Sequence, residues 1–283
     1  MIFKAENNTF TLAVKEMGAE LNSLKSKKSG FEFIWNGNEE YWYGQSPILF
    51  PIIGRLLDDK YRLNGTEYTM PKHGIVRKKP FTLIESTTDS LTFVQTDDEE
   101  SIAMYPYKFE LKVKFTLTET GLVVDHTVIN KSDETMYYSF GAHPAFNCEI
   151  GDYLEFNKDT VLTTERIDHD SILIEEKFPV AMDGNKVVIT EDIFVDDALI
   201  LSNYSSDVVT LKSNNHGREV KFNFKSPLLG IWAKPGAPYV CIEPWWGVND
   251  NYDKKDDLSQ KRGIMEIEAG KSETFSWSIE ITE

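Results

Sequence analysis

An alternation of apolar and polar residues with a period of two is the strongest feature of this sequence. It is clearest in FELKVKFTLT (109–118), where every second residue is apolar. Successive side chains of a β-strand point to opposite faces, so the pattern predicts a strand with one buried face. GLVVDHTVIN (121–130) follows after a Glu-Thr-Gly turn, and the two segments together predict a hairpin.

The same signal recurs along the chain between clusters of Gly, Pro, Asn and Asp. Further strands are predicted at 91–95, 136–140, 186–190, 198–203, 208–214, 219–224, 228–234, 239–245 and 274–282. Helical signals are poor: 97–106 predicts one short turn, and 250–263 predicts a polar loop with a turn of helix. Many strands without intervening helices favour an all-β fold, one large antiparallel sandwich or barrel.

No internal repeat and no Pro- or Gly-rich linker divides the 283 residues. A β-sandwich can reach roughly 250 residues as one unit, so we expect a single domain over 1–283. The two cysteines, Cys148 and Cys241, form no disulfide framework and are expected to be buried thiols. The N-terminus has no signal-peptide pattern and no segment is apolar enough to span a membrane, so we expect a cytoplasmic protein.

The charge balance narrows the class of partners. Thirty Lys and Arg against 46 Asp and Glu give a net charge of −16. Such a surface repels phosphate backbones and anionic lipids, so neither nucleic acid nor a membrane is expected as a partner. A local basic pocket for a small anion remains compatible with this balance.

Aromatic residues gather in two polar segments, EFIWNGNEEYWYGQSP (32–47) and EPWWGVND (243–250). Flat aromatic faces beside carboxylates and amides suit sugar rings, because the C–H face of the ring stacks and its hydroxyls form hydrogen bonds. The clusters together therefore favour a small-molecule sugar site over simple core packing.

Three ionisable residues occupy unusual positions for a β protein. His73 precedes a glycine in MPKHGIVR, His143 precedes a proline in SFGAHPAFN, and Glu243 ends an apolar strand in VCIEPWWG. A carboxylate at the end of a buried strand is costly unless it is paired or used. These three side chains predict an acid–base site at strand ends. By contrast, His126 lies in mid-strand and is expected to face solvent or a sheet surface.

Several common catalytic motifs are absent, including GxGxxG, GxxxxGK[ST], HExxH and GxSxG. Nucleotide chemistry and a serine hydrolase thus have no support. His73, His143 and Glu243 could form a metal triad, but their wide separation in sequence favours acid–base use. No metal or organic cofactor is expected.

At these residues the sequence resembles the aldose 1-epimerase (galactose mutarotase) family, and most closely its branch of LacX-like proteins. The matching blocks are SPILFPIIGRL (46–56), MPKHGIVR (70–77), SFGAHPAFN (139–147) and CIEPWWGVND (241–250). The resemblance covers essentially the whole chain in the family's order. It implies a single large β-sandwich of the galactose mutarotase type, with a sugar site in a cleft on one sheet.

The resemblance also implies roles for individual residues. Glu243 resembles the general base that removes the proton of the C1 hydroxyl, and His143 resembles the general acid on the ring oxygen. The resemblance implies substrate binding for the remaining members of the site: His73, Arg55, Arg77, Trp245 and Asp197, the last in preference to Asp196. The family's blocks differ here around His143 and after Glu243, which leaves the natural sugar open.

Four functions remain as alternatives. The first is an aldose 1-epimerase acting on a neutral hexose such as galactose or glucose. The second is a hexose-6-phosphate 1-epimerase, which needs cations near the site, with Arg77, Lys78 and Lys79 as candidates. The third is a non-catalytic carbohydrate-binding protein, and the fourth a metal-dependent isomerase or dioxygenase. A monomer or a homodimer is expected.

Overall fold

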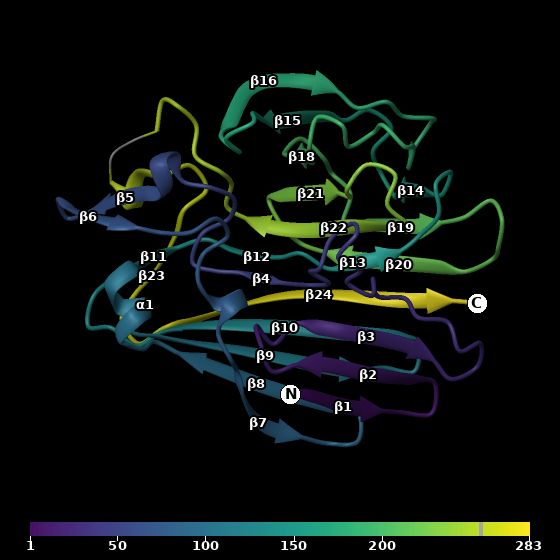
Figure 1. Ribbon diagram of the computed structural model, residues 1–283, viewed down its shortest axis with the longest axis horizontal. Helices are drawn as coiled ribbons and strands as arrows, with labels where there is room; N and C mark the ends of the chain where they lie inside the picture. The colour runs from purple at the N-terminus through teal and green to yellow at the C-terminus, as the bar shows by residue number, and fades with distance from the viewer. Residues whose placement is uncertain (255–256) are drawn as a thin grey trace.

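The structure is a computed structural model that describes residues 1–254 and 257–283. Nine antiparallel strands form the longest sheet, in the order β17-β14-β19-β20-β24-β10-β9-β8-β7 (Figure 1). Along the chain these strands are β7 (Thr82–Ser86), β8 (Ser90–Thr96), β9 (Phe109–Leu117), β10 (Gly121–Asn130), β14 (Tyr153–Phe156), β17 (Lys186–Val188), β19 (Val208–Lys212), β20 (Glu219–Phe224) and β24 (Ser272–Thr282).

The predicted hairpin forms the middle of this sheet. β9 and β10 pair in register from Leu122 opposite Leu117 to Asn130 opposite Phe109. Alternate residues of β9 are buried, as their apolar character requires. The other strands predicted between 91 and 282 are also present, so the all-β prediction is confirmed.

The prediction for His126 is wrong. Its side chain is buried, with 2% of its surface exposed, on the inward face of β10. The ring packs against Phe140 at 4.9 Å between centroids, and its Nδ1 lies 3.4 Å from the carbonyl oxygen of Phe275. Apolar residues occur on both faces of β10, Val123 among them, so alternation alone did not identify the inward face.

A second sheet of eight strands carries the residues of interest. Its order is β16-β15-β18-β21-β22-β12-β4, and β13 pairs with β22 beside β12. These strands are β4 (Ile48–Leu49), β12 (Phe140–Ala142), β13 (Ala145–Asn147), β15 (Thr163–Ile167), β16 (Leu173–Pro179), β18 (Leu199–Leu201), β21 (Leu228–Trp232) and β22 (Tyr239–Trp246). β22 lies in the interior of this sheet and is buried along almost its whole length.

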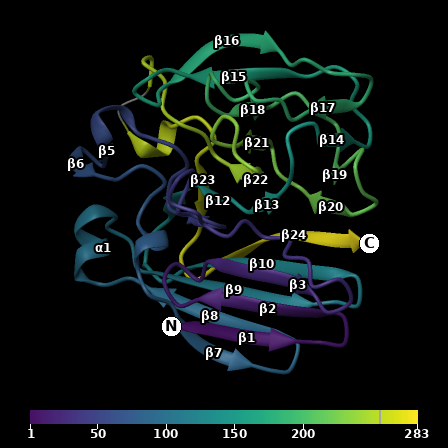
Figure 2. The same ribbon diagram turned by 45° about the vertical axis from the view of Figure 1, so that its right-hand side comes forward.

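The remaining strands of the described residues form three small sheets. One contains β1 (Ile2–Glu6), β2 (Phe10–Lys15) and β3 (Leu21–Ser26), one contains β5 (Lys60–Leu63) and β6 (Thr66–Thr69), and one contains β11 (Met136–Tyr138) and β23 (Met265–Ile267). The first of them lies over the long sheet in both views (Figure 2), and Phe3 packs edge-on to Phe93 at 5.5 Å. One buried apolar cluster contains residues from Ala5 to Ile279, so the sheets share a core.

Helices are few and short, as predicted. The only α-helix among the described residues is α1 (Glu99–Met104), which begins with a capping box between Asp98 and Ser101. Three 3₁₀ turns are present: η1 (Leu57–Asp59), η2 (Val76–Lys78) and η3 (Leu258–Gln260). Two residues of the loop predicted at 250–263 lie outside the described part of the chain. No described helix is long and apolar enough to cross a membrane.

Candidate active site

β22 positions the central residues of the site. Successive side chains alternate between faces, so Glu243 and Trp245 project from the same side of the strand. Gly230 on β21 and Gly141 on β12 leave the space that the indole of Trp245 fills. A Cβ at these two positions would lie 2.8 Å and 3.0 Å from the Trp245 ring. The indole is thereby held where its Nε1–H donates to Glu243 Oε2, at 3.1 Å.

His143 lies directly opposite Glu243. It sits between the end of β12 and the start of β13, where Pro144 interrupts the strand. Its Nε2 lies 3.3 Å from Glu243 Oε2, and the two side chains are 11% and 1% exposed. Trp42 stacks on the imidazole at 4.9 Å and Trp232 meets it edge-on at 5.9 Å. These two indoles fix the plane of the His143 ring.

His73 approaches the pair from a turn. Its φ of +66° places the residue in the left-handed region, and its backbone N–H donates to Gly54 O at 2.8 Å. The backbone N–H of Gly54 in turn donates to His73 Nδ1 at 3.2 Å. Because Nδ1 accepts this hydrogen bond, the proton of the neutral ring is on Nε2. His73 is therefore a fixed hydrogen-bond donor, with its ring centroid 6.1 Å from that of His143.

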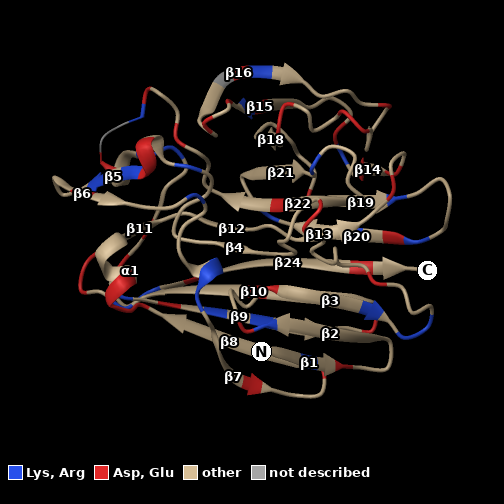
Figure 3. Cartoon of the chain, viewed as in Figure 1, with Lys and Arg blue, Asp and Glu red and all other residues tan. Residues whose placement is uncertain are grey.

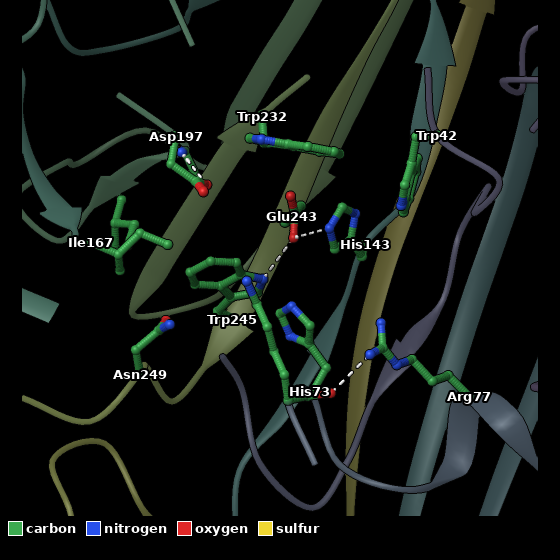
Figure 4. A pocket seen from close by; sticks show the side chains of 13 residues that line it. Trp42, His73, Arg77, His143, Ile167, Asp197, Trp232, Glu243, Trp245 and Asn249 are labelled. Carbon is green, nitrogen blue, oxygen red and sulfur yellow. Dashed lines mark hydrogen bonds and ion pairs between the residues drawn. The ribbon is translucent and has the colours of Figure 1, made fainter. Parts of the chain in front are cut away.

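These residues surround a cavity of about 260 Å³ (Figure 4). Its wall combines three indoles, several ionisable groups, one amide and three aliphatic side chains. The lining residues are Trp42, Lys72, His73, Arg77, His143, Ile167, Asp197, Ala198, Ile200, Trp232, Glu243, Trp245 and Asn249. Aromatic faces and convergent polar groups thus meet in one cavity, as a binding site for a small polar molecule requires.

Burial dominates the electrostatics of the cavity. It raises the pKa of Glu243 well above its usual range, although the Trp245 hydrogen bond and the charge of Lys72 act against this. Burial also lowers the pKa of His143 to about 3 and that of His73 well below its usual range. Without a ligand, the pair of Glu243 and His143 therefore favours the uncharged form, with one proton between the two groups.

Two cations line the cavity, in a molecule whose acidic and basic positions are otherwise interspersed over both sheets (Figure 3). Lys72 Nζ donates to the hydroxyl of Ser171 at 2.9 Å, and burial lowers the pKa of Lys72. Arg77 Nη2 donates to the backbone carbonyl of Lys72 at 2.9 Å. Within the described residues neither cation forms an ion pair with a carboxylate. The wall that they form is locally positive despite the net charge of −16.

The structure brings most of the site residues predicted from the sequence into one cavity. His73, Arg77, His143, Asp197, Glu243 and Trp245 all line the cavity. Of the two candidate aspartates, Asp197 lines the cavity, whereas Asp196 pairs with Arg166 at 2.6 Å outside it.

The structure does not bring Arg55 to the cavity wall. Its guanidinium binds both carboxylate oxygens of Asp59, at 2.8 Å and 2.9 Å, and donates to the backbone of Asp170. Lys79 is likewise committed elsewhere, to Asp98 and Glu100. A basic residue near a predicted site is therefore not placed in it by sequence proximity alone.

Besides three aliphatic residues, four polar or aromatic lining residues were missed: Lys72, Trp42, Trp232 and Asn249. Lys72 directly precedes His73 in sequence, and Trp42 belongs to an aromatic cluster that was noted, so both carried a weak signal. Asn249 occupies a space that only a glycine at position 54 leaves open, since a Cβ there would lie 2.1 Å from its side chain. No local pattern reveals such a contact.

One set of atoms in the site has the spacing of metal ligands. A ring nitrogen of His143, Cys241 Sγ and a carboxylate oxygen of Glu243 lie within 4.8 Å of one another. Burial raises the pKa of the Cys241 thiol well above its usual range, and a protonated thiol is a poor ligand. The donor set therefore suits proton transfer better than metal binding.

Comparisons with known proteins agree with this geometry. A family model described as aldose 1-epimerase matches residues 1–253. The chromosomal protein LacX of Lactococcus lactis is 32% identical over 284 residues, which cover 94% of this chain and 95% of LacX.

Solved structures extend the likeness to three dimensions. A galactose mutarotase related enzyme from Lactobacillus acidophilus is 34% identical with a TM-score of 0.94, over 100% of this chain and 98% of that one. A galactose mutarotase-like protein from Lactobacillus casei is 29% identical with the same TM-score, and both chains are fully covered. The fold is therefore galactose mutarotase-like, and the chain belongs to the aldose 1-epimerase family.

Proposed function

We propose that this protein interconverts the α and β anomers of a hexose such as galactose or glucose. The observation that carries the proposal is the buried contact of 3.3 Å between Glu243 and His143 in an aromatic-walled cavity. A carboxyl group and an imidazole that share one proton can remove one proton and deliver another in a single active site. Anomer exchange requires both transfers.

The reaction opens and recloses the sugar ring. Glu243 as carboxylate takes the proton of the C1 hydroxyl while protonated His143 gives a proton to the ring oxygen. The C1–O5 bond breaks and C1 becomes the aldehyde carbon. Rotation about C1–C2 presents the other face of the aldehyde. The C5 hydroxyl then attacks C1, and the two residues return their protons in reverse, so the enzyme ends unchanged.

The resting pair must first move its proton from Glu243 to His143. Burial favours the uncharged pair, but the Trp245 N–H and the charge of Lys72 both stabilise the carboxylate. Hydroxyls of a bound sugar add further donors to Glu243. The reactive charge state thus forms when the cavity is occupied, which keeps it out of contact with bulk water.

The remaining residues orient the substrate. The Nε2–H of His73 donates to a sugar oxygen, and Asp197 and Asn249 offer acceptors and donors at the opposite wall. Trp42, Trp232 and the ring of Trp245 offer flat apolar faces to the C–H face of the sugar. Fixing the ring in this way places C1 and O5 between the acid and the base.

Anomer exchange measured by NMR tests the proposal. Purified protein should accelerate exchange of at least one of glucose, galactose, xylose or maltose above the buffer rate. Glu243→Gln and His143→Ala should each slow it by at least about 100-fold. The matched controls Glu99→Gln and His169→Ala, both in exposed positions, should leave the rate unchanged. Near-normal exchange in Glu243→Gln would overturn the assignment. Saturable sugar binding without exchange would favour a carbohydrate-binding protein instead.

A second candidate is a hexose 6-phosphate as substrate. It is favoured by Lys72 and Arg77, which line the cavity without a carboxylate partner among the described residues. A phosphate is the anion that such a pair of cations binds well. Lys72→Met should then lower kcat/KM for glucose 6-phosphate by at least about tenfold and change that for glucose little. An equal loss with both sugars would favour the neutral hexose.

A further inference from the structure

A second cavity of about 330 Å³ lies apart from the catalytic residues. The two cavities share no lining residue. The second cavity is formed by the segment 31–36, by residues 147–152 after β13, and by the β19–β20 hairpin. Nothing in the proposed reaction uses it.

One wall of the second cavity is aromatic. Phe31, Phe33 and Trp35 alternate along an extended segment, and the rings of Phe31 and Phe33 meet edge-on at 5.0 Å. Pro238 and Leu211 extend this apolar surface. A wall of this kind offers a flat apolar face to a small ring.

Groups with unmet hydrogen bonds lie beside this aromatic wall. Asp152 is only 2% exposed; its Oδ2 accepts the Glu149 N–H at 2.8 Å, and its Oδ1 has no partner. Arg218 lies over the Phe31 ring at 4.1 Å and its Nε also has no partner. His216 Nδ1 accepts a hydrogen bond from the backbone N–H of Arg218 at 3.3 Å, so the proton of the neutral ring is on Nε2. A buried carboxylate oxygen without a partner is costly and calls for a ligand or water.

The chemistry of these groups indicates the class of ligand. Asp152 Oδ1 needs a donor and Arg218 Nε needs an acceptor, and His216 Nε2 offers a further donor; a hydroxyl group can donate and accept. The opposite charges of Asp152 and Arg218 favour a ligand without net charge. A flat apolar wall beside such groups suits the C–H face and the hydroxyls of a sugar ring. We propose that the second cavity is a further binding site for a neutral monosaccharide, distinct from the catalytic cavity.

Aromatic contacts connect the two cavities. Trp35 packs against Tyr239 at 4.6 Å with the rings tilted by 33°, Tyr239 stacks on Trp42 at 5.7 Å, and Trp42 stacks on His143 at 4.9 Å. The Trp35 Nε1–H also donates to the backbone carbonyl of Trp42 at 2.9 Å. The indole N–H of Trp35 is consequently a reporter at the wall of the second cavity, as that of Trp245 is at the catalytic one.

Titration with D-galactose or D-glucose, each alone up to about 100 mM, tests the site by indole ¹⁵N–¹H NMR of the six tryptophans. The Trp35 and Trp245 resonances should shift with separate midpoints. Asp152→Asn keeps the shape of the side chain and an acceptor for Glu149. It should raise the sugar concentration at the midpoint of the Trp35 shift by at least about tenfold and leave the midpoint of the Trp245 shift unchanged. The matched control Asp89→Asn, in an exposed turn, should change neither.

Two outcomes would overturn the proposal. One is no shift of Trp35 with either sugar, which leaves water as the occupant. The other is a Trp35 shift that shares the midpoint of Trp245 and persists in Asp152→Asn, because it then only reports the catalytic cavity. The test is independent of turnover. Absence of anomer exchange would refute the proposed function, while a separate Trp35 event would still support the second site.

Discussion

Replacement of His126 by phenylalanine should make the protein less sensitive to acid. Burial lowers the pKa of His126 from 6.5 to about 4 in the folded protein. The unfolded chain therefore binds a proton that the folded protein does not bind between these two pH values. Stability that is present above pH 6.5 is lost as the pH falls through this window. His126→Phe removes the proton-binding group from both states, and with it this part of the loss.

The size of the effect follows from the two pKa values. Between pH 7 and pH 5 the histidine costs about 2 kcal/mol of unfolding free energy, and down to pH 4 about 3 kcal/mol. Phenylalanine keeps an aromatic ring against Phe140 and gives up only the long contact of 3.4 Å to Phe275. Urea denaturation at a series of pH values measures both proteins. The difference in their unfolding free energies should move in favour of the variant by these amounts.

His126→Leu checks that the result does not depend on how phenylalanine fits. Both variants should show the same change with pH, whatever their absolute stabilities. A difference between variant and wild type that stays constant from pH 7 to pH 5 would refute the reasoning. It would mean that the His126 ring is protonated as readily in the folded protein as in the unfolded chain.

Three further predictions concern the site and its support. Trp245→Phe removes the N–H donor to Glu243, so the acidic limb of the kcat/KM profile should move to higher pH. Gly54→Ala, at a φ of +68° and facing Asn249, should lower the unfolding free energy by about 3 kcal/mol in urea titrations. Lys261→Met removes the shorter ion pair of the buried Asp250, at 2.8 Å, and leaves it only the longer one to Lys254, at 3.5 Å, so it should cost about 1.5–3 kcal/mol by the same measurement.

The fold was readable from the sequence because alternation is a local property. The β9–β10 hairpin needed only the pattern of one segment and the turn that follows it. Pairings between distant strands carry no such signal. β20 pairs with β24, whose first residue lies 48 positions beyond the end of β20, and the order of the nine strands was therefore not predicted.

The residues of the site also fall into those that a local sequence pattern reveals and those that it does not. Glu243 and His143 stood out because an ionisable group next to a proline interrupts an apolar strand, which is visible in the sequence. Lys72 looks like any surface lysine until the turn that it shares with His73 is folded over the cavity. Arg55 was predicted to bind substrate from the family resemblance, yet an aspartate four residues later binds its guanidinium. One cation is thus withheld from the cavity by a contact within its own loop, and the other reaches the cavity through the fold of its turn.

The turn between β15 and β16 contacts two residues of the cavity wall without lining the cavity itself. Ser171 in this turn accepts a hydrogen bond from Lys72 at its hydroxyl and from Asn249 at its carbonyl. Glu243 and His143, by contrast, are held by β22 and the β12–β13 junction. For the proposed reaction, we expect insertions or deletions in the turn to change which sugars bind and to leave the proton transfers intact. Selectivity and reactivity would then depend on separate segments, each of which could change without the other.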